Sequence, residues 1–185
     1  MPSPKELTDE ELLKGCLRKE RKYQELLYRR YAKKMYAICQ AYARDKEVAQ
    51  DILQDGFVKV FTKINTFNPD NSLEGWVRRI MTNTAIDYFR QNKKLDRFIE
   101  LEEQHSEETS DDAVNKKINV DEILYYLDRL PDGARMIFNL YAIEGYSHKE
   151  IAKQLNISEG TSKSQFSRAR GLIKTYLSGL QGGVA

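Results

Sequence analysis

Residues 161–168 bring together short hydroxyl, amide and basic side chains. The members of this group are Thr161, Lys163, Ser164, Gln165, Ser167 and Arg168. Hydroxyls and amides can hydrogen-bond the edges of bases, and Lys and Arg can also bind phosphates, so this group could recognise nucleic acid. The same side chains could instead form the solvated polar face of an ordinary surface helix. The elements that hold them decide between these two interpretations.

Two short helices separated by a turn are expected to position this group. The Ser-x-x-Glu sequence at 147–150 is a capping box, which predicts a helix over residues 148–155. Asn156 tolerates a turn conformation, and Ser158 is a good N-cap for a second helix that begins at residue 159. This is helix-turn-helix spacing, in which the second helix lies in the major groove and its exposed N-terminal half contacts bases and phosphates.

Apolar residues recur at helical spacing along almost the whole chain. Thr8 and Glu11 form another capping box, Asp45 can cap the third helix, and the loop "INTFNPDNS" ends in a cap at Asn71 or Ser72. No alternating pattern lasts long enough to predict a strand, so the expected fold class is all-α. The predicted helices cover residues 8–17, 23–42, 45–61, 73–91, 113–130, 136–145 and 148–155, and the last begins at residue 159.

Charge and composition divide the chain into two basic parts. The formal net charge is +2, yet residues 100–112 contain seven acidic side chains and no Lys or Arg. Polar, acidic composition of this kind cannot bury enough apolar area to offset the entropy of ordering. We therefore predict two small helical domains, residues 1–95 and 113–185, joined by a flexible acidic linker over 96–112. Two basic domains favour a polyanionic partner, and the acidic strip is either kept off that partner or serves only as a solvated spacer.

Several classes of protein are not supported by the sequence. No stretch approaches the ~20 apolar residues of a membrane span, and no secretory signal is evident, so we expect a cytoplasmic protein without direct membrane insertion. Cys16 and Cys39 lie in apolar helical stripes, with His105 and His148 as their only potential companions, so neither a disulfide nor a metal site is predicted. No nucleophile, base or metal set converges, which predicts neither enzyme activity nor a cofactor.

Nearly the whole chain resembles the extracytoplasmic-function group of bacterial sigma-70 family RNA polymerase sigma factors. The resemblance rests on three segments in order: "DKEVAQDILQDGFVKVF", "TFNPDNSLEGWVRRIMTNTAIDYFRQNKK" and a C-terminal segment that begins with "LPDGARMIFNLYAIEGYSHKEI". These are similar to the helix that binds the polymerase clamp, the part that opens the −10 element, and the domain that binds the −35 element. The resemblance implies a protein that binds core RNA polymerase at its β′ clamp and β flap. It would then direct initiation at promoters that are duplex at −35 and melted at −10.

The polymerase-binding surface implied by this resemblance is a row of acids and amides on the third helix. Its residues are Gln50, Asp51, Gln54 and Asp55. Gly56 departs from the bulkier residue usual at its position and costs helix propensity. Close approach of a partner backbone is one compensation for that cost.

The resemblance assigns −10 recognition to the loop before the fourth helix and to the basic side of that helix. A flipped base needs hydrogen-bonding groups and a stacking or apolar wall, and its neighbouring phosphates need basic residues. Phe67 could either stack on a base or pack on the protein, whereas Trp76 lies on the apolar face and is expected in the core. The −10 residues are Phe67, Asn68, Asp70, Ser72, Arg78, Arg79, Asn83, Arg90, Lys93 and Lys94.

The −35 element is assigned to the second helix of the helix-turn-helix. Lys163 is expected to contact phosphate, because it lacks the planar fork that lets Arg read a base. Ser162 stands where the family commonly has a buried Val, which predicts weaker packing of this helix. The −35 residues are Thr161, Lys163, Ser164, Ser167 and Arg168.

A rival interpretation is a ligand-sensing repressor with a sensor domain, a linker and a terminal helix-turn-helix. Such a protein needs a dimer seam and a ligand constellation. The sequence has no heptad seam and no evident ligand set, so the sigma-factor interpretation is preferred. The resemblance also allows a membrane-linked anti-sigma factor as an inhibitory partner, although no residue identifies one.

Overall fold

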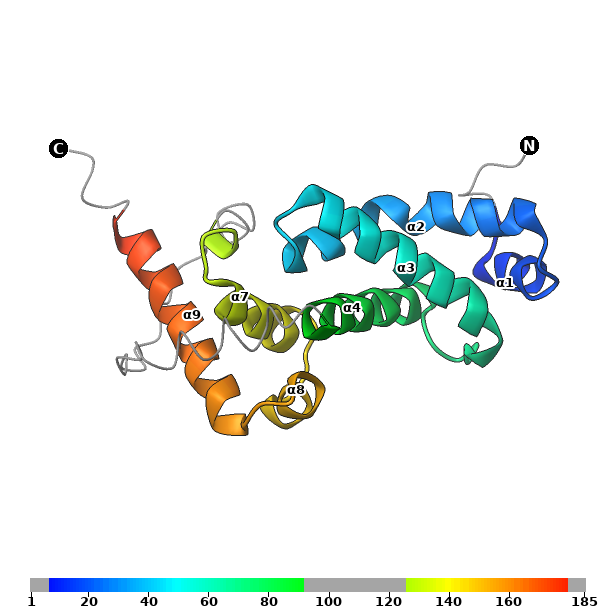
Figure 1. Ribbon diagram of the computed structural model, residues 1–185. Coiled ribbons are helices and arrows are strands. Elements are labelled where there is room, and N and C mark those ends of the chain that lie inside the picture. Colours follow the sequence, from blue (N-terminus) through cyan, green and yellow to red (C-terminus); the bar gives the residue numbers. More distant parts are fainter. Residues whose placement is uncertain (1–6, 92–125, 180–185) are drawn as a thin grey trace. The chain divides into compact units, whose positions relative to one another are not determined.

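The structure is a computed structural model that describes residues 7–91 and 126–179 (Figure 1). The chain divides into two compact units, residues 1–88 and 89–185. None of the described residues lies in a strand, so the expected all-α fold is confirmed. The predicted linker over 96–112 and the predicted start of the second domain at 113 lie outside the described residues.

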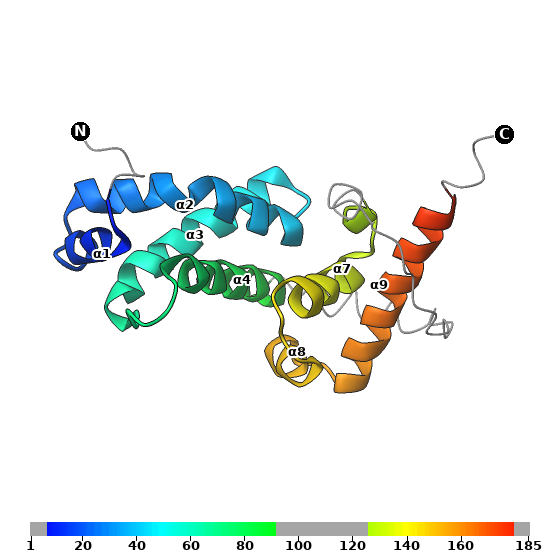
Figure 2. The same cartoon turned by 180° about the vertical axis from the view of Figure 1, so that it is seen from behind.

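The N-terminal unit is built from helices that follow one another through short connections. Their bounds are α1 (Asp9–Leu17), α2 (Arg21–Tyr42), α3 (Lys46–Lys63), the 3-10 helix η1 (Ile64–Thr66) and α4 (Leu73–Gln91). In the opposite views of Figures 1 and 2, α3 runs beside α2 and reaches α4. These bounds match the predicted helices closely, and η1 adds a turn that the apolar pattern did not indicate.

Side-chain caps start the helices of this unit where the sequence predicts them. The Thr8 Oγ1 accepts a hydrogen bond from the Glu11 amide at 3.2 Å, and the Glu11 carboxylate accepts one from the Thr8 amide at 2.8 Å. Asp45 caps α3 by accepting from the amides of the second and third helical residues. For α4 the cap is Ser72, whose Oγ accepts from the Gly75 amide at 3.2 Å. Of the two expected caps, Ser72 rather than Asn71 therefore makes the bond.

Gly56 of α3 packs directly against Met81 of α4. A Cβ atom at Gly56 would lie 2.2 Å from the Met81 Sδ, far inside van der Waals contact, and Met81 is fully buried. The close approach expected for a partner backbone is therefore made within the protein's own core, which corrects that expectation. The packing of Met81 compensates for the helix propensity that Gly56 loses, about 1 kcal/mol relative to Ala.

Both cysteines lie in the core of the N-terminal unit. Cys16 of α1 and Cys39 of α2 are buried free thiols. Burial raises the pKa of Cys16 to about 11 and the pKa of Cys39 to about 12, because a thiolate would lose its hydration there. At neutral pH both side chains therefore remain thiols and pack as small apolar groups.

The C-terminal unit places a helix-turn-helix against a preceding helix. Its elements are α7 (Asp132–Phe138), the π-helix η2 (Asn139–Ile143), α8 (His148–Leu155) and α9 (Glu159–Gly179). A cluster of buried residues on α7, on α9 and before α7 forms a core, whose members are Tyr126, Leu127, Leu130, Ala134, Ala169 and Ile173. This core supports α9 along its C-terminal half and leaves the first turns of α9 to be held by α8 and η2.

The helix expected over 136–145 differs from the observed one in start and type. It begins at Asp132, directly after Pro131, because Pro is tolerated where an amide would have no intrahelical partner. Its last part widens into η2, and Gly145 follows with φ +77°. A π-helix is typically a local insertion into an α-helix, which apolar spacing alone does not indicate.

No described helix, in either 7–91 or 126–179, is long and apolar enough to cross a bilayer.

Candidate nucleic-acid and polymerase interfaces

The predicted helix-turn-helix is present, with both of its caps. The Ser147 Oγ accepts from the Glu150 amide at 3.3 Å, while the Glu150 carboxylate accepts from the Ser147 amide at 2.8 Å. Asn156 ends α8 in the left-handed conformation, with φ 58° and ψ 45°. The Ser158 Oγ then accepts from the Thr161 amide at 2.9 Å, which caps α9. Local signals therefore set the start, the turn and the restart of this motif.

The phase of α9 separates the residues that face the core from those that can meet DNA. Ser162, Gln165 and Ala169 are buried and follow one another at helical spacing. The interpretation of Gln165 as a DNA contact is therefore wrong, since its side chain is only 3% exposed and lies on the core stripe. Of the predicted −35 residues, Lys163 and Ser164 are exposed, and Thr161, Ser167 and Arg168 are half-buried at the edges of this face.

Hydroxyls on the first turns of α9 are partly used within the helix. The Ser164 Oγ donates to the Thr161 carbonyl at 3.0 Å, and the Thr161 Oγ1 lies 2.9 Å from the Ser158 Oγ. A Ser164 hydroxyl that donates to its own helix offers a base edge only its acceptor lone pairs. Donation from Ser164 to a base edge would therefore require this bond within the helix to break.

His148, the first residue of α8, contacts α9. Its Nδ1 lies 2.9 Å from the Oγ of the fully buried Ser162. The imidazole also stacks on Tyr141 of η2, with ring centroids 4.3 Å apart and an interplanar angle of 16°. Burial lowers the pKa of His148, the nearby Lys163 ammonium lowers it further, and Glu159 opposes both effects. Ser162 thus takes part in a polar contact, and α9 is not merely less well packed there as the sequence predicted.

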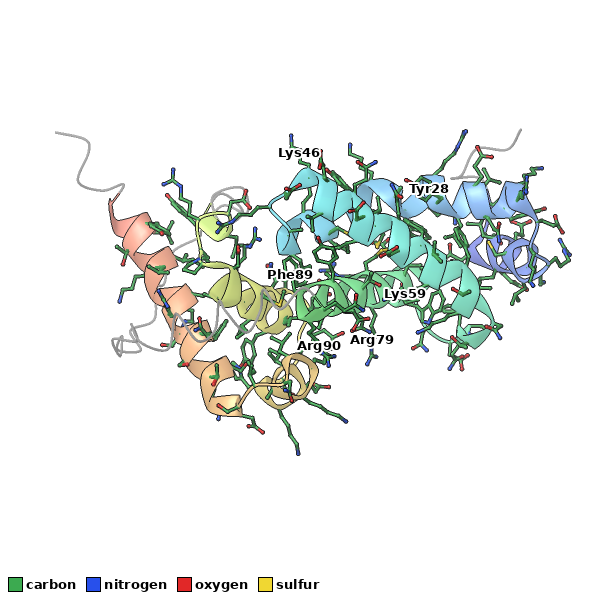
Figure 3. The ribbon with its side chains drawn as sticks, in the orientation of Figure 1. Tyr28, Lys46, Lys59, Arg79, Phe89 and Arg90 are labelled. Carbon is green, nitrogen blue, oxygen red and sulfur yellow. The ribbon has the colours of Figure 1, made fainter. Side chains whose placement is uncertain are left out.

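One side of α4 presents a basic and amide track. Arg79, Asn83 and Arg90 are exposed, and their spacings of four and seven residues place them on the same face of the helix. Figure 3 labels Arg79 and Arg90 on α4. Arg78 lies about 100° away from Arg79 around the helix and is half-buried. Lys93 and Lys94, the other predicted phosphate contacts, lie outside the described residues.

Two ion pairs hold α4 against its neighbours without using this track. The Lys34 Nζ lies 2.8 Å from the Glu74 Oε2, which joins α2 to α4, and the Lys59 Nζ lies 3.0 Å from the Asp87 Oδ2, which joins α3 to α4. Because both pairs are largely exposed, each contributes little to stability, and the buried apolar side of α4 supplies most of its hold.

The loop before α4 folds on itself and on the start of that helix. The rings of Phe67 and Trp76 meet edge to face, with centroids 5.5 Å apart, and both residues are half-buried. The Asn68 Oδ1 accepts from the Asp70 amide at 3.0 Å, and Ser72 caps α4, so these two polar side chains shape the loop. Trp76 therefore supports Phe67 at the protein surface, rather than lying fully in the core as expected.

Asn83 lies further along α4 than the loop. Trp76, on which Phe67 packs, and Asn83 are seven residues apart on this continuous helix, which is a rise of about 10 Å and places them on the same side of the helix. A binding place that the loop and Asn83 share stays a prediction.

The predicted polymerase-binding residues form a continuous exposed ridge on α3. Gln50, Asp51, Gln54 and Asp55 are all exposed, and the ridge extends one turn further to Val58, whose side chain is 64% exposed. Sequence reasoning did not single out Val58. Its signal was an apolar residue that falls outside the helical stripe of the core.

Comparison with known proteins matches two segments of the chain to family models. The model of sigma-70 region 2 matches residues 27–95, and the model of sigma-70 region 4 matches residues 121–173. The first segment contains the α3 ridge and the α4 track, and the second contains the helix-turn-helix. The two matches together cover most of the chain.

Individual relatives are sigma factors of one group. The ECF RNA polymerase sigma factor SigE of Mycolicibacterium smegmatis is 30% identical over 82% of this chain, and the match spans 60% of that relative. The ECF RNA polymerase sigma factor SigM of Bacillus subtilis is 28% identical over 80% of this chain and 91% of that relative. Among solved structures, the sigma factor RpoE of Bartonella quintana in complex with the anti-sigma factor NepR aligns with a TM-score of 0.48. That alignment has 21% identity and covers 83% of this chain and 96% of that one. From its two matched regions and its relatives, the chain belongs to the extracytoplasmic-function group of the sigma-70 family of RNA polymerase sigma factors.

Proposed function

We propose that this sigma factor binds core RNA polymerase through the α3 ridge, opens the −10 element along α4 and reads the −35 element with α9. The observation that carries the proposal is the helix-turn-helix, in which α9 turns Ser162 and Gln165 to the core and presents Lys163 and Ser164 outwards. A second unit with an exposed acidic ridge complements it. The proposed role requires no catalysis by this chain, since RNA synthesis belongs to the core enzyme.

The α3 ridge suits a basic protein surface. Asp51 and Asp55 supply negative charge, Gln50 and Gln54 supply amides, and Val58 adds an apolar end. A charged rim around an apolar contact gives an interface both steering and desolvated packing. The β′ clamp of the core polymerase is the proposed partner of this ridge, and the β flap is the proposed partner of the C-terminal unit.

The α4 track and its loop suit a separated DNA strand. Phe67, braced by Trp76, can stack on one unpaired base, while Asn83 can both donate to and accept from the edge of another. Arg79 and Arg90 lie on the same face as Asn83, where phosphates of the same strand can be bound. The proposed path for the melted strand therefore follows the axis of α4.

The repressor alternative is not favoured, because a ligand-sensing repressor has no use for the α3 ridge or for a track that binds unpaired bases. A membrane-linked anti-sigma factor stays an expectation from the family resemblance, and none of the described residues is assigned to it.

Transcription with purified components tests the proposal. Mixed with core RNA polymerase, the full chain should co-elute with it and support run-off transcripts from a subset of a library of upstream regions. Core polymerase alone should give none of those transcripts. Specific binding of the free chain to a palindromic duplex, with neither co-elution nor initiation, would instead favour the repressor.

A further inference from the structure

The contact between His148 and Ser162 lies in the first turn of α9. The His148 Nδ1 is 2.9 Å from the Ser162 Oγ, and Ser162 is fully buried. A buried hydroxyl without a partner costs far more than a hydroxyl in water, so α9 is more stable in this position while the hydroxyl is satisfied. The imidazole nitrogen is a partner that satisfies it.

The imidazole is itself held by aromatic rings. The imidazole stacks on the Tyr141 ring, with centroids 4.3 Å apart, and meets the Phe166 ring edge to face, with centroids 5.8 Å apart. The centroids of the Tyr141 and Phe166 rings are 4.5 Å apart. These rings come from η2 and α9, and His148 comes from α8. The Nδ1 atom is therefore presented to Ser162 by a ring whose orientation three elements determine.

The rotation of α9 about its axis decides which side chains reach DNA. Ser162 adjoins Lys163 in sequence, and successive residues of a helix are about 100° apart. A rotation that carried Ser162 towards solvent would therefore carry Lys163 and Arg168 away from their present directions. The first turns of α9 depend on this contact most, because the buried cluster around Ala169 and Ile173 holds the later turns.

We propose that His148 is a positioning residue for −35 recognition, which fixes the rotation of α9 through Ser162 and thereby places Lys163 and Arg168 in the major groove. This inference rests on the proposed −35 recognition by α9. His148 contacts no base in this scheme and acts only through Ser162. Without this contact, His148 would only be the first residue of α8.

A double-mutant cycle separates positioning from ordinary packing. His148→Phe retains a ring for the stack but has no nitrogen, so it leaves the Ser162 hydroxyl buried without this partner. Ser162→Ala removes the hydroxyl, and the half-buried His148 can then use water. The double variant, His148→Phe with Ser162→Ala, removes both polar groups at once. Such a paired removal changes stability little when the shapes of the side chains are kept.

The readout is promoter preference by holoenzyme assembled from the full chain and core polymerase. Duplex libraries are randomised at the −35 and −10 elements, and the −10 preference serves as an internal control because α4 and the loop before it are proposed to make it. His148→Phe should lower affinity for the parent's selected −35 sequence about tenfold, as expected for an unpaired buried hydroxyl, and flatten the −35 preference. The −10 preference should not change. The double variant should recover to within about threefold of the parent.

A second pair of variants covers the case in which His148→Phe does not fold. His148→Asn keeps a polar atom near the place of Nδ1 and should retain the −35 preference, whereas His148→Leu should lose it. Circular dichroism gives the folded fraction of each protein. Three results would each overturn the inference: a parent-like −35 preference in His148→Phe or His148→Leu, no recovery in the double variant, or losses that only follow the unfolded fraction. A parent holoenzyme without preference at either element would overturn the proposed function and this inference with it.

Discussion

Lys163 and Arg168 lie on adjacent rows of the outer side of α9, and their head groups are expected to bind DNA differently. Lys163 shares its row with Ser167, and Arg168 shares the other with Ser164, since residues four apart lie above one another on a helix. The Arg guanidinium can form two parallel hydrogen bonds with a guanine edge. The Lys ammonium acts as a point charge and suits a phosphate. Arg168 is therefore expected to contribute specificity, and Lys163 is expected to contribute general affinity.

Replacing these two residues separately should distinguish the two contributions. Arg168→Ala should weaken binding of the preferred −35 duplex by about 1–3 kcal/mol and relax preference at one position. Lys163→Ala should weaken all sequences alike and reduce the slope of log affinity against log salt by roughly 1. Holoenzyme binding to −35 duplexes over a range of salt measures both. If the two variants bind and initiate like the parent, recognition takes place on another surface.

Asn83 is proposed to act after the DNA strands separate. It is exposed on the α4 face that also carries Arg79, about 15 Å along the helix from Leu73. Asn83→Ala should leave polymerase binding and −35 duplex binding nearly intact, yet reduce open complexes measured by permanganate reactivity of thymines near −10. A template already mismatched across −10 should restore part of the lost initiation, because the cost of unpairing is removed in advance. Arg79→Ala serves as a control, since loss of a phosphate contact should persist on the mismatched template. Equal permanganate signals from Asn83→Ala and the parent would assign Asn83 a structural role.

At the scale of elements, α3 carries two different surfaces on opposite sides. Its exposed ridge is proposed to meet the polymerase, and its buried side approaches α4 through Gly56. Substitutions on the ridge should therefore change assembly without changing stability. Substitutions at Gly56 should change stability without directly changing the surface that meets the polymerase.

Charge reversal tests the ridge. Asp51→Lys combined with Gln54→Lys should reduce co-purification with core polymerase about tenfold or more, because like charges would face a basic partner. The melting temperature should stay close to that of the parent, as both side chains are exposed. Glu25→Lys combined with Ala37→Lys makes the same total charge change on exposed positions of α2 and serves as the control. Unchanged co-purification of the ridge variant would remove the assignment of this surface.

A single methyl group tests the packing of α3 on α4. Gly56→Ala should lower the stability of the N-terminal unit, because the cost of overpacking against Met81, typically about 1–3 kcal/mol, exceeds the gain in helix propensity of up to ~1 kcal/mol. Gly75→Ala is the matched control, since a Cβ there would meet nothing nearer than the Ser72 Cβ at 3.6 Å and should be neutral or stabilising. Urea unfolding followed by fluorescence of Trp76, the chain's one tryptophan, measures both. A Gly56→Ala protein as stable as the parent would show that displacing the Met81 side chain costs no more than the helix propensity gained, up to ~1 kcal/mol.

At the scale of the whole molecule, acid should affect the two units in sequence. The pKa of His148 is lowered on folding, so its neutral form is favoured, and stability present above its unfolded pKa is lost as pH falls through the lowered value. The pKa of Glu11 is also lowered, chiefly by the Thr8 backbone amide and then by the Thr8 hydroxyl, so its cap is lost only below the ordinary range of a carboxyl. Lowering pH from 7 should therefore weaken the C-terminal unit first and α1 later. Hydrogen exchange of backbone amides across pH measures this order, and His148→Phe should remove the first step. Loss of protection in α1 before α8 and α9 would contradict it.

Local signals account for most of the fold that sequence could predict. The capping boxes at Thr8 and Ser147 set helix starts through bonds that span three residues, so the residues themselves contain the necessary information. The contact of His148 with Ser162 spans fourteen residues and depends on how α8 and α9 pack. The prediction of Gln165 as a DNA contact failed because its residue type suggests exposure, whereas its position around the axis of α9 places it beside the core. The roles of the DNA-facing and polymerase-facing residues stay predictions, since they depend on partners as well as on the fold.

The two buried thiols make the N-terminal unit a reporter of its own opening. Cys16 and Cys39 are the chain's two cysteines, and both are enclosed in that unit as protonated thiols. A thiol-specific reagent can modify them only when the packing of α1 and α2 opens, because the reagent needs both access and thiolate. Labelling rates in the native chain therefore report the opening of this unit alone, whatever happens in the helix-turn-helix. Slower labelling after addition of core polymerase would show that assembly stabilises the N-terminal unit. The ratio of the two labelling rates would measure that effect without any engineered probe.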